Sequence, residues 1–245
     1  MQLERGRGVV VVCCVWLCGV VLCGQPRVTL VESRWGNFFM VENTTLPVAA
    51  AFAILPANSI CSCKTLCIAS GRCQAWSLVE TAGGGECRIA AGGPTTHNTT
   101  VNTTGTYFFR QESVNGTYVW RDDQLLYLLM PGLMLYPQAK ELCSSIPGHR
   151  LLIVKSAQQA SVLRYLWSLY SYPWATDLTK TAAGPVWGDG TPYNTTELSH
   201  TIKMTTNDYD TVHQHYAVYD SYLDDWYDDA LVNVACQTNP RGVDW

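Results

Sequence analysis

The segment YPQAKELCSSIPGHRLLIVKSAQQASVLRYL, residues 136–166, carries the strongest fold signal of the chain. Its first ten residues place apolar side chains at helical spacing around Cys143. A second amphipathic helix is expected after Ser156, because serine is a good N-cap and Val162 and Leu166 lie one helical turn apart. Beyond this segment the chain is rich in Gly, Trp and Tyr, and it ends in two strand-like runs, HYAVYD and ALVNVACQ. Two helices are therefore expected ahead of a region of loops and strands.

The same segment, with the residues that follow it, resembles the C-type lectin-like domain. In that family an aromatic-x-x-Ala helix leads to a cysteine, a glycine, a Leu/Ile strand, a serine and a second helix. The matching residues are Tyr136, Ala139, Cys143, Gly148, Leu151, Ile153, Ser156 and Leu163. WATDLTK stands where the family has a W-I-G-L strand, and VWGDGTPYN resembles its W-x-D-G-T-P turn. The resemblance implies an α+β domain over residues 118–238, with two helices, antiparallel strands and a long loop region.

Two distant cysteines, Cys143 and Cys236, enclose nearly all of this domain. A disulfide across a loop of that length would contribute roughly 4 to 5 kcal/mol in the chain-entropy model. In the family, W-N-D-x-x-C is followed eight positions later by the last cysteine. Counting back from Cys236 puts Asp228 at the cysteine position and residues 223–225 at the W-N-D positions. The usual partner of that cysteine, expected near Tyr216, is absent too, so both halves of one disulfide are missing together.

A calcium site is the first candidate for function, because sugar-binding members of the family hold the sugar through calcium. Calcium takes about six to eight oxygen ligands. The resemblance implies Asp224, Asp225 and Asn207 as metal ligands, and the loop ahead of them adds Asp208 and Gln214 as ligand-binding candidates. This loop lacks the family's Glu-Pro-Asn motif, whose cis-proline aims the side-chain carbonyls, so the site is not preorganised. The expected cofactor is none, or calcium.

An acidic and aromatic surface is the alternative for the same region. It consists of Trp226 and Tyr227 with Asp228 and Asp229. Trp and Tyr are favoured anchors in protein interfaces and stack against sugar faces. This surface would suit calcium-independent binding of another protein.

Other candidate sites carry less weight. His213 and His215 would share one face of a strand, but no third metal ligand stands at suitable spacing. Three tryptophans, Trp167, Trp174 and Trp187, are expected in the core. The chain contains no G-x-S-x-G, H-E-x-x-H or phosphate-loop motif, which argues against an enzyme.

A cysteine-dense segment marks the first half of the chain. Cys63 and Cys67 are four residues apart, so a helix would place both sulfurs on one face, and Asn58 or Ser59 would be its N-cap. CQAWSLVE and ECRIA follow as two strands joined by TAGGGE, and the loop GGPTTHNTTVNTTG is expected to be exposed. The pattern resembles a PAN/apple domain, a small disulfide-stapled module with one helix on an antiparallel sheet. The resemblance covers residues 25–112 and implies the disulfides Cys63–Cys87 and Cys67–Cys73.

One cysteine, Cys61, departs from that pattern. It makes the number of cysteines after the leader odd, which indicates a free thiol, an alternative pairing or a disulfide-linked dimer. A zinc site is disfavoured, because the only histidine nearby is His97 in the loop and the expected compartment favours disulfides.

The start of the chain has the pattern of a secretory signal peptide. Arg5 and Arg7 precede an apolar run, and small residues follow near residue 24. The run is short for a membrane span, so residues 1–24 are expected to be removed, without stable membrane insertion. The formal net charge of −4 argues against nucleic acid as a partner. Five N-x-Ser/Thr sequons agree with a secreted glycoprotein: Asn43, Asn98, Asn102, Asn115 and Asn194.

The sequence thus predicts a secreted, extracellular protein of two α+β domains. Residues 113–117 would be a linker and residues 239–245 a polar tail. Lectin-like binding of a glycan or an extracellular protein, without catalysis, is the expected function.

Overall fold

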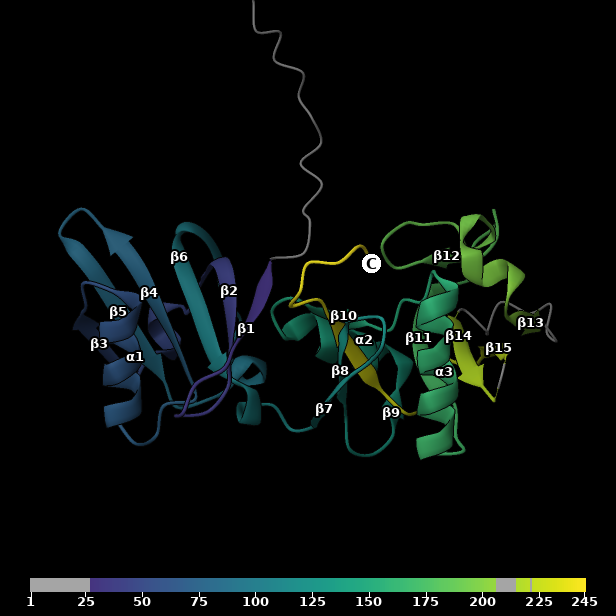
Figure 1. The fold of residues 1–245 in the computed structure, drawn as a ribbon, viewed down its shortest axis with the longest axis horizontal. Coiled ribbons are helices and arrows are strands. Elements are labelled where there is room, and N and C mark those ends of the chain that lie inside the picture. The colour runs from purple at the N-terminus through teal and green to yellow at the C-terminus, as the bar shows by residue number, and fades with distance from the viewer. Residues whose placement is uncertain (1–26, 206–214, 221) are drawn as a thin grey trace, which may run out of the picture.

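A six-stranded antiparallel sheet dominates the first half of the structure. The computed structural model describes residues 27–205, 215–220 and 222–245. The sheet has the order β1-β2-β6-β4-β5-β3, and the helix α1 lies on one of its faces (Figure 1). Its elements are β1 Val28–Val31, β2 Phe38–Thr45, β3 Ala53–Pro56, α1 Ile60–Ala69, β4 Ala75–Thr81, β5 Gly84–Ala90 and β6 Thr100–Arg110. One helix on an antiparallel sheet is therefore confirmed for this half.

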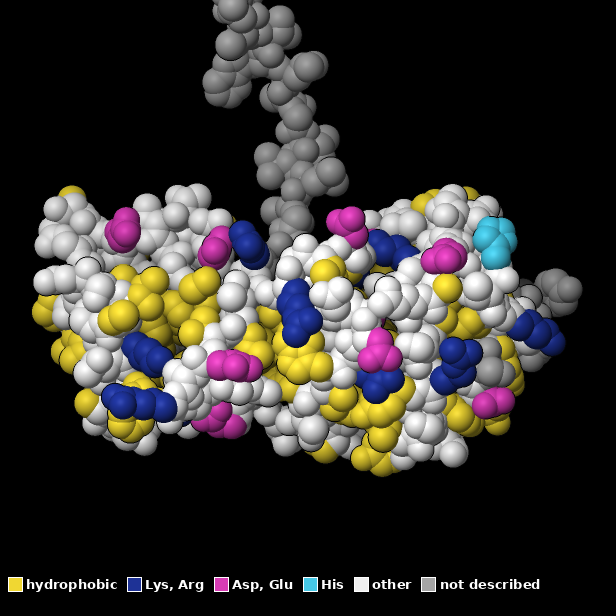
Figure 2. Space-filling view, viewed as in Figure 1, with side chains coloured by type: hydrophobic (Ala, Val, Ile, Leu, Met, Phe, Trp, Pro, Cys, Tyr) yellow, Lys and Arg dark blue, Asp and Glu magenta, His cyan; other side chains and the backbone are white. Residues whose placement is uncertain are grey.

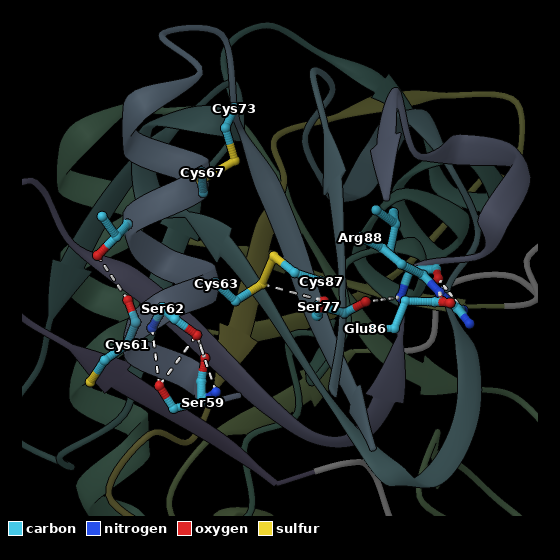
Figure 3. Close-up of a disulfide and its surroundings, with 12 residues drawn as sticks. Ser59, Cys61, Ser62, Cys63, Cys67, Cys73, Ser77, Glu86, Cys87 and Arg88 are labelled. Carbon is cyan, nitrogen blue, oxygen red and sulfur yellow. Dashed lines mark hydrogen bonds and ion pairs between the residues drawn. A yellow bond between two sulfur atoms is a disulfide. The ribbon is translucent and has the colours of Figure 1, made fainter. Parts of the chain in front are cut away.

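Ser59 is the N-cap of α1 and is one of the two N-cap residues that the sequence offered. The hydroxyl of Ser59 accepts from the backbone N–H of Ser62, and the Ser62 hydroxyl accepts from the N–H of Ser59 (Figure 3). This reciprocal capping satisfies two of the N–H groups that a helix start leaves free. Disulfides join Cys63 to Cys87 in β5 and Cys67 to Cys73, the pairs that the resemblance implied. The first bridge ties α1 to β5 of the sheet, and the second ties it to the segment just before β4.

The loop expected over residues 92–105 is shorter than the sequence indicated, and that expectation is wrong for its last part. Strand β6 already begins at Thr100 and pairs with Thr45 of β2. Thr and Val favour strands, and here the end of β2 supplies the hydrogen-bonding partner. Gly105 permits the close approach, because a Cβ there would meet the Thr45 side chain at 1.9 Å. The sequons at Asn98 and Asn102 therefore stand just before β6 and within it.

Three smaller sheets and two helices build the second half. A four-stranded sheet has the order β10-β17-β8-β7, a five-stranded sheet the order β12-β11-β14-β15-β13, and β9 pairs with β16. The helices are α2 Tyr136–Ser145 and α3 Ala157–Leu169. The strands are β7 Thr117–Trp120, β8 Leu126–Leu129, β9 Met134–Leu135, β10 His149–Leu151, β11 Trp174–Thr179, β12 Val186–Trp187, β13 Lys203–Thr205, β14 His215–Tyr219, β15 Tyr222–Trp226, β16 Leu231–Val232 and β17 Ala235–Thr238. Short 3-10 turns lie at Val48–Ala50, Pro94–Thr96, Gln111–Ser113, Tyr193–Thr195 and Glu197–His200.

Both predicted helices of this half are confirmed, and local sequence explains their ends. Pro137 lies in the first turn of α2, where a missing N–H is tolerated. Ser156 caps α3 through the backbone N–H of Gln159, whose side chain accepts from the N–H of Ser156 in return. A disulfide joins Cys143 of α2 to Cys236 of β17. The chain is of the α+β class, as predicted.

The two halves share one hydrophobic cluster. Phe39 and Phe109 of the first sheet pack in the same core as Leu128 and Cys236 of the second half. The expected linker, residues 113–117, is not free of this packing, since Val114 is buried and β7 begins at residue 117. An apolar side chain in a short connection is buried when the elements on either side pack against each other.

The expected polar tail is also packed. The guanidinium of Arg150 lies 3.7 Å from the ring centroid of Trp245, and the ammonium of Lys155 donates to the carbonyl oxygen of Trp245. Of the three tryptophans expected in the core, Trp174 and Trp187 are buried and Trp167 is half-buried. No helix among the described residues has the length and apolarity needed to cross a membrane.

Candidate functional site

The hairpin of β14 and β15 carries most of the candidate site. Its register places Tyr219 opposite Tyr222 and Ala217 opposite Asp224. Side chains alternate along a strand, so Tyr222, Asp224 and Trp226 share one face of β15. The burial of β15 follows this alternation, because Leu223 and Asp225 are buried and the other three residues are half-buried. The two adjacent aspartates therefore belong to opposite faces of the sheet.

Each of these aspartates already has a contact within the protein. The carboxylate of Asp224 accepts a hydrogen bond from the hydroxyl of Thr205 in β13. The side chain of Asp225 is 1% exposed, and one of its oxygens lies 3.7 Å from the ammonium nitrogen of Lys180. A buried carboxylate requires a compensating charge, and Lys180 supplies one here.

Calcium ligation through Asp224 and Asp225 stays a prediction. Asn207, Asp208 and Gln214 lie outside the described residues, as does His213. Within the described ranges, no three His, Cys, Asp or Glu side chains gather in a way that could hold a metal ion. The cation that lies beside Asp225 in the structure is the ammonium group of Lys180, which belongs to the chain itself.

A contact that the sequence did not reveal joins His215 to Asp228. The Nδ1 of His215 lies 2.6 Å from a carboxylate oxygen of Asp228. The ring of His215 also stacks on Tyr136 of α2, with centroids 3.7 Å apart. The sequence resemblance put Asp228 at the position of a cysteine that this chain lacks, and the partner of that cysteine was expected near Tyr216, next to His215. The contact between His215 and Asp228 therefore joins β14 to the segment after β15. The resemblance places a disulfide of related domains at this point, and this chain has no cysteines there.

A second polar cluster lies on the α2 side of the five-stranded sheet. Asp177 of β11 accepts from the ammonium of Lys140 at 2.7 Å and from the hydroxyl of Tyr136 at 3.3 Å. Burial, and then the charge of Asp177, raise the pKa of the Tyr136 hydroxyl. Tyr136 therefore stays protonated and donates to Asp177, an arrangement that holds α2 in place.

Aromatic side chains from three elements form a continuous strip along the hairpin. The aromatic strip consists of Trp167 of α3, Tyr219 of β14, and Tyr222 and Trp226 of β15. The ring of Tyr219 lies 5.1 Å from that of Trp167, 5.5 Å from that of Tyr222 and 6.2 Å from that of Trp226, between centroids. Tyr227 follows directly and is 47% exposed. The sequence identified Trp226 and Tyr227, whereas the contribution of Trp167 and Tyr219 depends on how α3 packs beside β14.

Cys61 is the remaining chemically distinctive side chain. It is exposed and unbridged, whereas the other six cysteines among the described residues form three disulfides. Figure 3 shows its sulfur pointing away from the Cys63–Cys87 bridge. A free thiol at that place fits the interpretation that Cys61 is unpaired within the chain.

The sequon asparagines lie at the surface. Asn43, Asn98, Asn115 and Asn194 are exposed, and Asn102 is half-buried, its side-chain oxygen accepting from Thr104. Figure 2 shows acidic and basic side chains scattered singly over the face in view, without a continuous basic patch of the kind that binds phosphate backbones.

Comparison with known proteins finds likeness at the level of solved structures. No protein-family model matches the chain, and no curated protein matches it. Solved structures that it resembles are C-type lectins. One is CEL-I from Cucumaria echinata, at 18% identity and a TM-score of 0.39, over 49% of this chain and 93% of that chain. Another is the Kupffer cell C-type lectin receptor Clec4f, at 17% identity and 0.42, over 52% and 85%. A third is the carbohydrate-recognition domain of the mouse scavenger receptor C-type lectin, at 15% identity and 0.42, over 52% and 97%. The likeness covers about half of this chain and does not identify its ligand.

Proposed function

We propose that this chain is an extracellular recognition protein whose second half is a C-type lectin-like module that binds glycans or glycoproteins and performs no catalysis. The observation that carries the proposal is the closure of the second half by β17. This last strand lies between β8 and β10, and Cys236 within it is bridged to Cys143 of α2. Together with two helices and a W-x-D-G-T-P turn, this is the arrangement that the sequence resemblance implies.

The binding surface that the geometry favours consists of the aromatic strip, Tyr227 and the carboxylate of Asp224. Aromatic rings stack on the apolar face of a sugar, and carboxylates accept hydrogen bonds from its hydroxyl groups. Asp224 shares a face of β15 with Tyr222 and Trp226, so both kinds of contact are offered side by side. The same combination suits a protein partner, which is the alternative function of this surface.

Recognition is proposed to be independent of calcium, because Lys180 already lies beside the buried carboxylate of Asp225. A calcium site with a dissociation constant of about 1 mM would add about 1.4 kcal/mol of stability at 10 mM calcium. We expect no such gain: thermal unfolding in 10 mM calcium, in 10 mM magnesium and in EDTA should give one midpoint. A calcium-specific rise that disappears in Asp225→Asn would establish the calcium site instead.

A glycan array, probed with and without chelator, tests the binding function. We expect signals that persist in chelator and that Tyr227→Ala lowers about tenfold, because truncating an exposed anchor removes about 1 to 2 kcal/mol. Tyr170→Ala is the matched control, since Tyr170 is exposed but lies outside the strip. Absence of any glycan signal, with capture of a protein ligand that Tyr227→Ala abolishes, would favour the alternative.

The proposal also covers the leader and the first half of the chain. Residues 1–24 are proposed to be a signal peptide, residues 25–112 a PAN/apple-like module, and the five sequons to carry glycans. Three disulfides agree with an oxidising compartment.

Cys61 is proposed to link two copies of the chain. Because its thiol is exposed and has no partner within the described residues, oxidation by a small disulfide such as oxidised glutathione can form a Cys61–Cys61 bridge between two chains. Non-reducing electrophoresis is expected to show a dimer that a reductant removes and that Cys61→Ser lacks. A wild-type protein that runs as a monomer after this oxidation would refute the link.

A further inference from the structure

A groove beside α1 is left open by the way the first half is packed. Helix α1 lies over β4 and packs in one core with Phe38 of β2 and Phe108 of β6. It leaves open the stretch of β2 and β6 around Glu42 and Thr106. Two adjoining hollows of about 400 and 380 Å³ occupy this part and share Ile60, Glu80, Thr104 and Thr106 as lining residues. Together they form one continuous surface feature, the α1 groove. Figure 2 shows hydrophobic side chains gathered over this half of the molecule.

The lining of the groove combines an apolar floor with two carboxylates. Met40, Ile60 and Leu78 contribute the apolar surface, and Ile60 is 41% exposed although it is a large aliphatic residue. Glu42 of β2 and Glu80 of β4 are the charged residues among the described lining residues, which include no Lys or Arg. Neither carboxylate forms an ion pair with a Lys, Arg or His of the described residues, so the groove is locally anionic.

The start of α1 lies at one end of the groove, and its dipole does not reverse this charge. A helix N-terminus is equivalent to about half a positive charge, less than the two carboxylates carry. Two of the N–H groups at this helix start are occupied, because Ser59 and Ser62 cap each other. Lys64, one turn further along α1, holds its ammonium 5.4 Å from the ring centroid of Phe38. The two carboxylates therefore outweigh the helix start, and the groove favours a cation over an anion.

We propose that the α1 groove is a docking site for basic side chains, lysine or arginine, on an extended segment of an extracellular protein. The apolar floor contacts the aliphatic stem of such a side chain, while its charged head meets the carboxylate of Glu42 or Glu80. The net negative charge of the chain attracts the same class of partner. This site lies in the first half and does not depend on the lectin-like function proposed for the second half.

Binding of a fluorescent hexalysine peptide, measured by anisotropy at low salt, tests the proposal directly. N-linked glycans are removed first, because Asn43 stands at the rim of the groove. We expect Glu80→Gln to weaken hexalysine binding at least about fivefold, the size expected for one partly exposed charge contact at low ionic strength. Glu141→Gln is the matched control, since Glu141 is an exposed acid on α2 in the other half. Equal affinity of wild type and Glu80→Gln for hexalysine would overturn the proposal.

Cys61, which lines one of the two hollows, gives a second and local measurement. A cationic methanethiosulfonate reagent should modify the reduced Cys61 thiol at least about fivefold faster than an anionic one, because the carboxylates concentrate cations in the groove. Glu80→Gln should reduce this ratio and hexalysine should slow the reaction. Equal rates for the two reagents would show that the groove is not anionic, and a rate that hexalysine leaves unchanged would show that basic segments dock elsewhere.

Discussion

Replacing Cys143 and Cys236 by alanine is expected to lower the free energy of unfolding by about 4 to 5 kcal/mol. The bridge spans 93 positions in sequence, and in the chain-entropy model a closed loop of that length removes this much conformational freedom from the unfolded chain. Both cysteines are fully buried, so their truncation also loses packing. Urea unfolding followed by tryptophan fluorescence measures the loss, because several tryptophans lie in the core.

The control for this experiment is the shorter bridge of the first half. Cys67 and Cys73 are separated by only 6 positions, so their double alanine variant should lose about 2 kcal/mol. An equal loss in both variants would show that loop closure does not govern the stability. Unchanged stability without Cys143 and Cys236 would show that the closure by β17 is held by strand pairing alone.

Acidification from pH 7.5 to pH 4 is expected to remove about 3 kcal/mol of stability through His149 alone. Burial lowers the pKa of His149 from 6.5 to about 4, partly offset by its hydrogen bond with the carbonyl of Pro147. The ring packs against Phe39 of the first half and Tyr118 of the second, at the junction of the two halves. The unfolded chain binds a proton near pH 6.5 and the folded chain only near pH 4. The stabilisation is therefore complete above pH 6.5 and is lost as the pH falls toward 4.

A comparison of variants isolates this contribution from the carboxylates that titrate in the same range. The difference in unfolding free energy between wild type and His149→Gln should shrink by about 3 kcal/mol from pH 7.5 to pH 4. His200→Gln, which changes an exposed histidine, is the matched control. A constant difference between wild type and His149→Gln would mean that His149 does not stay neutral when folded.

Local patterns predicted the elements of the fold well. The sequence predicted helices over residues 60–69, 136–145 and 157–169, because helical spacing, N-cap serines and cysteine spacing are patterns of a few neighbouring residues. The sequence did not predict that β6 starts at Thr100, because residues 92–105 have the Gly, Thr and Asn content of a loop. The part from Thr100 becomes a strand only because β2 offers it a hydrogen-bonding edge. The packed segment around Val114 has the same origin, since its burial depends on both halves at once.

The candidate site was predictable in part. The sequence identified Asp224, Asp225, Trp226 and Tyr227, but it could not show that strand alternation separates the two aspartates. Lys180 lies 45 positions before Asp225, and no local sequence pattern predicts the contact between them. The sequence analysis considered His215 and Asp228 separately, but it could not show that they contact each other, because they lie 13 positions apart on different segments.

By itself, the sequence determined the α+β class, the helices, the cysteines available for bridging and the acidic, aromatic character of residues 222–229, since these properties are covalent or act over short stretches of chain. Only the tertiary structure decided which charges meet, which aromatic rings form a continuous strip and which sheet surface α1 leaves open. These features depend on contacts between residues far apart in sequence, and burial sets their energies once the whole chain has packed.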